Sequence, residues 1–326
     1  RKDIAELVGV NPSEIIFTSG GTEADNMAIH CALFDHGIKH AITTELEHHA
    51  VGHTLEILAE KGDIKLSYVK VDDKGRVDLA HLSDLLSNNE RSFVSLMHAN
   101  NEIGTMIDLK EVGEICRKHD AIFHSDTVQT MCHYPFNLKD VNIHFATCSA
   151  HKFHGPKGIG WLYVNQDIDI KPIIFGGAQE RNKRGGTENL LGIVGMAKAM
   201  EVANHDIQEH IDYVQGLKSY MIDRLKKEIP GVEFNGDAEG DSLYTVLNVR
   251  FPKVDNASML LFSLDLHGVA ASGGSACTSG SNKGSHVLKG IGCDMDRPSL
   301  RFSFSRMNSK ECVDYAIDKL NLLFNQ

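Results

Sequence analysis

The sequence predicts an α/β fold in which a mostly parallel sheet, covered by helices on both faces, forms a large domain and a smaller α+β domain follows. Two observations support this prediction. Short apolar runs alternate with amphipathic helical patterns over residues 1–205, and this alternation is typical of parallel sheets. From 206 onward, a long helical pattern and a few short strand patterns replace it. We therefore expect two domains, 1–205 and 206–326.

Each expected element has a local signal. Strands are predicted where short apolar runs end at glycine, proline or small polar residues, and helices where apolar residues recur every three or four positions. The strands expected in the large domain are 15–18, 39–43, 64–69, 92–97, 121–123, 143–147 and 158–164. The helices expected there are 1–9, 22–34, 50–61, 78–87, 108–119 and 187–203. The small domain is expected to contain helices at 206–228, 255–267 and 309–324, and strands at 232–234 and 244–251.

The composition is that of a soluble globular protein. Of the 326 residues, 42% are hydrophobic and 24% are charged, which is sufficient for a sizeable core. The net charge of −11 argues against a nucleic-acid surface, and no apolar run is long enough to span a bilayer. Seven cysteines without a C-x-x-C pair indicate a reducing compartment such as the cytoplasm. Because the sequence begins inside a helical pattern and without Met, an upstream targeting segment stays open.

Lys152 is the first candidate catalytic residue. It follows the expected strand 143–147 within the segment SAHKFHGPKG (149–158). The end of a strand in an open α/β sheet is a usual place for catalytic groups. A lysine held there and partly desolvated loses basicity and can form a Schiff base with an aldehyde. The alternative is an ordinary solvated loop lysine.

A glycine turn feeds the helix expected at 22–34. Gly20 and Gly21 precede Thr22, so unpaired backbone N–H groups, the helix dipole and one hydroxyl would together form an anion site. The G-K-[ST] ending of a P-loop is absent. The alternative is an ordinary helix cap.

Other polar residues follow the remaining expected strands. His48 can stack on a flat cofactor ring or move protons, or it can simply cap a helix. The adjacent residues His48 and His49 would point to different faces of a helix and make a poor metal pair, so no metal site is expected. Asp126 requires a cation, either a protonated ring nitrogen or an ordinary ion-pair partner. The polar residues expected to gather in one crevice at the strand ends are Thr22, His48, Asn101, Asp126, Gln129 and Lys152.

Three further features lie toward the C-terminus. The loop 175–189 is rich in glycine and cations, which favours an anion contact over purely solvated charges. Cys277 lies among small residues with no bulk to bury it, so an exposed thiol is a candidate nucleophile. The other six cysteines are expected to be buried. Arg301 lies in an alternating strand pattern and suits a carboxylate, either of a ligand or of an internal ion pair.

Taken together, these motifs resemble the cysteine desulfurases of the class V aminotransferase superfamily of pyridoxal-phosphate enzymes, in the branch with a long cysteine-bearing loop. The motifs that carry the resemblance, in order, are TSGGTEADN (18–26), EHHAV (47–51), HANNEIG (98–104), SAHKFHGPKG (149–158), RGGTEN (184–189), SGGSACTSG (272–280) and SLRFS (299–303). Two departures from the family pattern, Ala150 and Ser125, are small changes expected to tune the site. The resemblance implies the fold type I architecture of these enzymes.

The resemblance also implies a role for each candidate residue. Lys152 would carry pyridoxal 5′-phosphate, and Cys277 would take the sulfur atom of L-cysteine as a persulfide. The implied ring contacts are Asp126 to the ring nitrogen, His48 stacked on the ring, and Gln129 to the ring hydroxyl. The phosphate contacts are Gly21, Thr22, Ser149 and His151, with Thr187 from the other subunit of a homodimer. The substrate carboxylate contacts are Asn101 and Arg301.

The implied activity is release of L-alanine from L-cysteine, with the sulfur passed to an acceptor or scaffold protein for iron-sulfur cluster assembly or another sulfur-transfer pathway. Three alternatives stay open. The first is a selenocysteine lyase, and the second is another aminotransferase-like enzyme of class V. The third is a non-catalytic sulfur-assembly partner, although such a protein would be expected to lack Lys152 or Cys277. Neither a nucleic-acid nor a membrane partner is expected.

Overall fold

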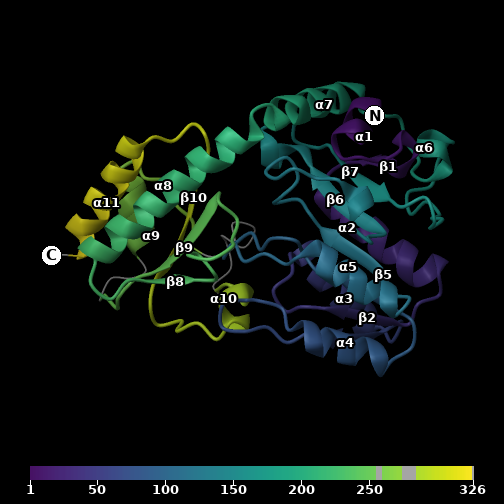
Figure 1. Cartoon of the computed structure of the whole chain (residues 1–326), viewed down its shortest axis with the longest axis horizontal. Coiled ribbons are helices and arrows are strands. Elements are labelled where there is room, and N and C mark those ends of the chain that lie inside the picture. The colour runs from purple at the N-terminus through teal and green to yellow at the C-terminus, as the bar shows by residue number, and fades with distance from the viewer. Residues whose placement is uncertain (255–258, 274–283, 325–326) are drawn as a thin grey trace. The chain divides into compact units, whose positions relative to one another are not determined.

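The computed structural model describes residues 1–254, 259–273 and 284–324. The chain forms two compact units (Figure 1). The first unit comprises residues 1–70, 77–98 and 107–207. The second unit comprises 208–326 together with two short segments, 71–76 and 99–106, that come from the N-terminal part of the sequence.

A seven-stranded sheet forms the centre of the first unit, in the order β1-β7-β6-β5-β4-β2-β3. Its strands are β1 (Ile15–Thr18), β2 (His40–Thr43), β3 (Lys65–Tyr68), β4 (Ser92–Ser95), β5 (Ile122–Asp126), β6 (Phe145–Ser149) and β7 (Gly160–Val164). Strands β3, β2, β4, β5 and β6 pair in parallel, whereas β7 is antiparallel to both β6 and β1. The predicted mostly parallel sheet is confirmed. Strand β7 reverses because the link from β6 holds no crossover helix that could return the chain for parallel pairing.

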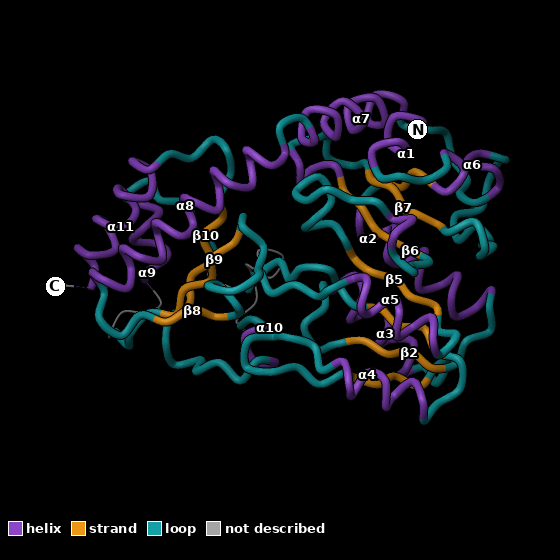
Figure 2. The backbone as a smooth tube through the Cα atoms, in the orientation of Figure 1, coloured by secondary structure: helices purple, strands orange, loops and turns teal. Residues whose placement is uncertain are grey.

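Helices cover both faces of this sheet (Figure 2). The helices of the unit are α1 (Lys2–Leu7), α2 (Gly21–His30), α3 (His49–Glu60), α4 (Leu79–Ser87), α5 (Leu109–Lys118), α6 (Gln179–Asn182) and α7 (Leu190–Asn204). Because successive strand residues point to opposite faces, Ile42 and Phe123 pack with α1, α4, α5 and α7. Their neighbours Ala41 and Ile122 pack with α2 and α3 on the other face. Burial on both faces explains the apolar runs that predicted these strands.

The second unit contains a small antiparallel sheet in the order β10-β9-β8. Its strands are β8 (Glu233–Asn235), β9 (Val246–Arg250) and β10 (Ser299–Ser303), and its helices are α8 (Ile207–Glu228), α9 (Leu260–Leu266), α10 (His286–Gly290) and α11 (Lys310–Phe324). The predicted α+β character is confirmed. Within the described ranges, no helix has the length and apolarity required to cross a membrane.

Candidate active site

Two predicted residues lie at the carboxyl ends of the neighbouring strands β5 and β6. Asp126 is the last residue of β5 and Ser149 the last residue of β6, and the two strands pair in parallel through Asp126 and Thr147. Gln129 lies in the turn directly after β5. The expected gathering of polar residues at strand ends is therefore seen for this part of the sheet.

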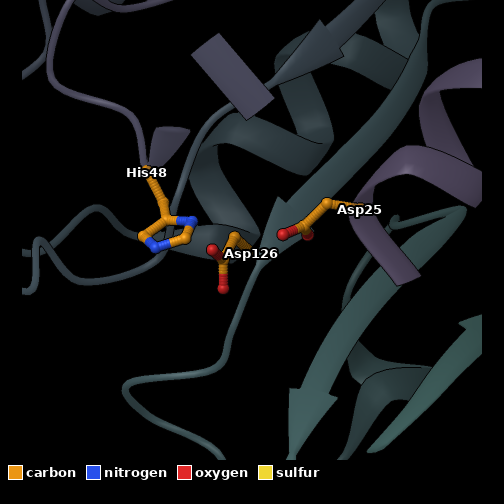
Figure 3. Close-up of side chains that lie close together, drawn as sticks. All are labelled: Asp25, His48 and Asp126. Carbon is orange, nitrogen blue, oxygen red and sulfur yellow. The ribbon is translucent and has the colours of Figure 1, made fainter. Parts of the chain in front are cut away.

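A cluster of three titratable side chains forms next to these strand ends (Figure 3). One side-chain atom each from Asp25, His48 and Asp126 lies within 4.8 Å of the other two. Asp25 comes from α2, His48 precedes α3, and Asp126 ends β5. The sequence analysis did not single out Asp25. The sequence feature that could have revealed Asp25 is its position on the same helical face as Ala28 and Ile29, which are both fully buried.

The surroundings of this cluster disfavour the ionised form of its carboxyl groups. Burial is the main cause that raises the pKa of Asp25 to about 7, and burial together with the nearby Asp25 raises the pKa of Asp126. Burial also raises the pKa of Glu47 to about 8, although Met97 N donates to its carboxylate oxygens at 3.0 and 3.1 Å. Two buried carboxylates this close cannot both ionise without a compensating cation. The cluster therefore suits a positively charged ligand group.

His48 has a structural task as well as a place in the cluster. It is the N-cap of α3, and its Nδ1 accepts the N–H of Ala50 at 3.2 Å. The capping role that the sequence left open is therefore present. Because Nδ1 serves as the acceptor, the ring proton of the neutral form is assigned to Nε2. The same cap fixes the ring next to Asp126, so capping and a site role are compatible in one residue.

The glycine turn before α2 packs tightly against the end of β6. Gly20 has φ 154°, and a Cβ there would lie 3.6 Å from Ser149 Oγ. A Cβ on Gly21 would meet a Val128 methyl carbon at 2.9 Å. Gly20 is the N-cap of α2 and brings no side-chain cap, so the first amides of the helix stay available to an anion. Ser149 Oγ also lies 2.9 Å from His151 Nδ1, which brings predicted phosphate contacts together. Thr22, the second residue of α2, is exposed at this end of the helix.

Lys152 lies just past the end of β6, as predicted, in the 3-10 turn η4 (Ala150–Phe153). The partial desolvation that the sequence led us to expect is not seen in the single chain, where the residue is exposed. The reason is the geometry of the turn, because Ala150 and Phe153 fill its buried positions and leave residues 151 and 152 on the outer side.

The loop 175–189 carries Thr187 beside Thr18 and Ser19, which directly precede the glycine turn. Thr187 is exposed and lines a cavity of about 190 Å³ together with Thr18 and Ser19. Arg184 in the same loop donates its Nε–H to Glu23 of α2 at 2.9 Å. The cationic charge of this loop is thus partly neutralised within the chain rather than left for an external anion.

Asn101 and Arg301 both lie in the second unit and are joined. Arg301 Nη1 donates to the backbone oxygen of Asn101 at 2.9 Å. Asn101 was expected in the large domain, 1–205. In the structure, the segment 99–106 groups with the second unit. The physical reason is backbone pairing, since Leu243 N donates to Gly104 O at 2.8 Å. The pair Asn101–Arg301 is therefore held by one body.

Cys277 lies outside the described residues. Of the other cysteines, five are buried as expected, namely Cys31, Cys116, Cys132, Cys148 and Cys293. Cys312 contradicts the expectation, because it is exposed near the start of α11. Hydrogen bonding by Ser309 lowers the pKa of its thiol.

Comparisons with known proteins agree along the whole chain. A family model described as aminotransferase class-V matches residues 1–316. A cysteine desulfurase IscS of Dictyoglomus turgidum is 41% identical over 330 residues, with 100% of this chain and 83% of the relative covered. A putative cysteine desulfurase IscS 1 of Bacillus subtilis is 43% identical, with 97% and 84% covered. The solved structure of a NifS-like protein superimposes with a TM-score of 0.90 at 36% identity, covering 99% of this chain and 86% of that one.

Proposed function

We propose a division of chemical tasks among the residues of this chain, which belongs to the aminotransferase class-V family and is a cysteine desulfurase. The reaction takes the sulfur atom from L-cysteine and leaves L-alanine. The observation that carries the proposal is the buried acid cluster at the strand ends, which suits a ligand cation.

The residues around this cluster fit pyridoxal phosphate, the cofactor of the family. When bound, the cofactor supplies an aldehyde that condenses with amines and a protonated ring that accepts an electron pair. Asp126 would pair with the ring nitrogen, His48 would lie against the ring, and Gln129 would bond the ring hydroxyl. The phosphate contacts would be Gly21, Thr22, Ser149 and His151, of which the first two offer helix N-terminal amides.

Lys152 would supply the amine that holds the cofactor and would then remove the proton from Cα of the substrate. This task needs a base tuned near neutral pH. Lys152 is exposed in the single chain, and binding of cofactor and substrate would desolvate it. His48, fixed as a helix cap, would relay protons through its Nε2.

Substrate recognition and sulfur transfer would fall to residues of the second unit and to Cys277. Arg301, tethered to the backbone of Asn101, would hold the substrate carboxylate with that asparagine. The Cys277 thiolate would attack the substrate sulfur, so that an S–S bond forms and the Cβ–S bond breaks. The balanced outcome is L-alanine and a persulfide on Cys277. A sulfur-acceptor or scaffold protein of iron-sulfur cluster assembly would receive the sulfur, and the cytoplasm is the proposed location.

A homodimer is supported by the surface around Thr187. Leu190, Leu191 and Val194 of α7 have exposed fractions of 69%, 89% and 68%, and Phe175 in the preceding loop is 84% exposed. Large apolar side chains gathered this densely mark an interaction surface. We infer that a second copy covers them, which would bring Thr187 to the phosphate of the partner's cofactor.

The proposal is tested by comparing the wild-type protein, loaded with pyridoxal phosphate, with Lys152→Ala and Cys277→Ser. The wild type should show a visible cofactor band and form alanine from L-cysteine. Lys152→Ala should lose the covalent attachment that borohydride fixes, and Cys277→Ser should bind L-cysteine without forming a protein persulfide. Full alanine formation by either variant would contradict the assigned role of that residue.

A further inference from the structure

We propose that Asp25 is a positioning residue that keeps its carboxyl group protonated near neutral pH and so leaves Asp126 as the single negative charge at the cofactor's ring nitrogen. The inference rests on the proposed cofactor site, and it assigns a task to a residue of the motif TSGGTEADN (18–26) to which the sequence alone gave none. Asp25 acts through Asp126 and need not touch the cofactor.

Asp25 is almost completely buried and has little hydrogen-bond support. Asp25 is 1% exposed, and among the described residues the one hydrogen bond that stabilises its carboxylate comes from the Thr147 hydroxyl, whose effect on the pKa of Asp25 is smaller than that of burial. An ionised carboxylate in such a place is strongly disfavoured, whereas a neutral carboxyl group is tolerated far better. The nearest potential cation is His124, whose Nε2 lies 3.4 Å from Asp25 Oδ1.

His124 does not supply that charge. Its two ring nitrogens already face hydroxyl groups, Nδ1 at 2.8 Å from Ser95 Oγ and Nε2 at 3.1 Å from Thr147 Oγ1. Complete burial lowers the pKa of His124 to about 4, so the ring is neutral at physiological pH. The short distance between Asp25 and His124 is therefore a contact between neutral groups and not an ion pair.

The second argument decides which acid of the pair keeps the proton. Asp126 accepts the N–H of Val128 at 2.9 Å, and His48 lowers its pKa, so its ionised form is supported. Among the described residues, no backbone N–H donates to Asp25, and only the Thr147 hydroxyl supports its ionised form. Once Asp126 is ionised, its charge within 4.8 Å raises the pKa of Asp25 further, because the two sites titrate as a pair.

The surroundings of Asp25 reinforce the same assignment. The titratable groups packed around the pair include Glu47, His48, His124 and Cys148. Burial raises the pKa of the Cys148 thiol, which keeps it neutral, and the charge of Glu47 would only oppose ionisation of Asp25. A single protonated ring nitrogen carries one positive charge. One ionised acid neutralises it, whereas a second one would leave a buried excess of negative charge. Keeping Asp25 neutral therefore matches the charge of the site to that of its ligand.

The test compares Asp25→Asn with Asp126→Asn, since asparagine imitates a neutral carboxyl group in shape. The apoprotein of each variant is titrated with pyridoxal phosphate at pH 7. We expect the dissociation constant of Asp25→Asn to stay within about threefold of wild type. That of Asp126→Asn should rise at least about a hundredfold, because a buried charge pair is broken. Equal weakening in both variants would overturn the proposal.

A second readout needs no cofactor. In infrared spectra of the wild-type apoprotein with isotope-labelled aspartate, we expect the band of a protonated carboxyl group at pH 6, and we expect it to disappear by pH 9. The band should persist in Asp126→Asn and vanish in Asp25→Asn. A wild-type spectrum without this band overturns the proposal even where a variant does not fold. If instead the wild type failed to bind pyridoxal phosphate, the proposed function would fail while the infrared result still decided the state of Asp25.

Discussion

Glu180 holds a strained turn at the start of the loop that carries Thr187. Glu180, Arg181 and Asn182 all adopt left-handed φ values of 47°, 58° and 63°. The left-handed conformation costs about 1–2 kcal/mol for a residue other than glycine or asparagine, so Glu180 and Arg181 together store about 2–4 kcal/mol. Contacts outside the turn must offset this strain.

The Glu180 carboxylate provides the offset. It accepts both Nη groups of Arg1 at 2.7 and 2.6 Å and the N–H of Phe17 at 3.1 Å, and its side chain is 3% exposed. Removing one partner of a buried ion pair costs about 3–5 kcal/mol. That loss is comparable with the stored strain. In Glu180→Ala we therefore expect the turn to open by itself while the sheet stays folded.

Trypsin reports this opening, because Arg181, Lys183 and Arg184 lie within the loop. Proteolysis of a segment that opens and closes quickly follows the population of its open form. A loss of about 3–5 kcal/mol corresponds to cleavage about two to four orders of magnitude faster, at about 1.4 kcal/mol for each tenfold change. Glu188→Ala, at an exposed acid of the same loop, is the matched control and should be cleaved at the wild-type rate. Cleavage of Glu180→Ala at the control rate would refute the reasoning.

Three further predictions concern the second unit and the sheet. Lys218 is buried, donates to a buried hydroxyl and a backbone carbonyl, and burial lowers its pKa from 10.5 to about 8. Between these pH values the unfolded chain binds one proton more than the folded chain. The unfolding free energy of the wild type should therefore rise by about 3 kcal/mol from pH 8 to 10.5. Urea titrations of Lys218→Met should show no such rise. Ser285 donates to the buried carboxylate of Glu102 at 2.6 Å; a double-mutant cycle of Ser285→Ala and Glu102→Gln should give a coupling energy of about 1.5–3 kcal/mol in urea unfolding, and a cycle without coupling contradicts this. A Cβ on Gly160 would lie 2.3 Å from a carbonyl oxygen of β6, so Gly160→Ala should lower the unfolding free energy by about 3 kcal/mol. Gly216 lies on the open face of α8, and Gly216→Ala should raise the unfolding free energy by about 0.5–1 kcal/mol.

Local patterns predicted most elements of the fold and much of the site, but not the short helices α6 and α10. The buried strands β4, β5 and β6 read as apolar runs because both of their faces are covered. Asp126 and Ser149 were expected shortly after the runs 121–123 and 143–147, and each is the last residue of the longer strand that forms. The antiparallel direction of β7 was not visible in its sequence, because an apolar strand has the same pattern in either direction.

Contacts between distant parts of the chain required the tertiary structure. Asp25 looks like one acid in a helix until the fold brings it to Asp126, 101 positions along the sequence, because periodicity records which face is buried and not what that face meets. The left-handed turn at 180–182 is held by contacts of Glu180 with Arg1 and Phe17, which lie far away in the sequence. The sequence by itself thus determined the secondary structure, the motifs and their chemistry, since these depend on neighbours along the chain. Only the tertiary structure decided which charges are buried together, because the energy of a buried charge depends on groups that are close in space.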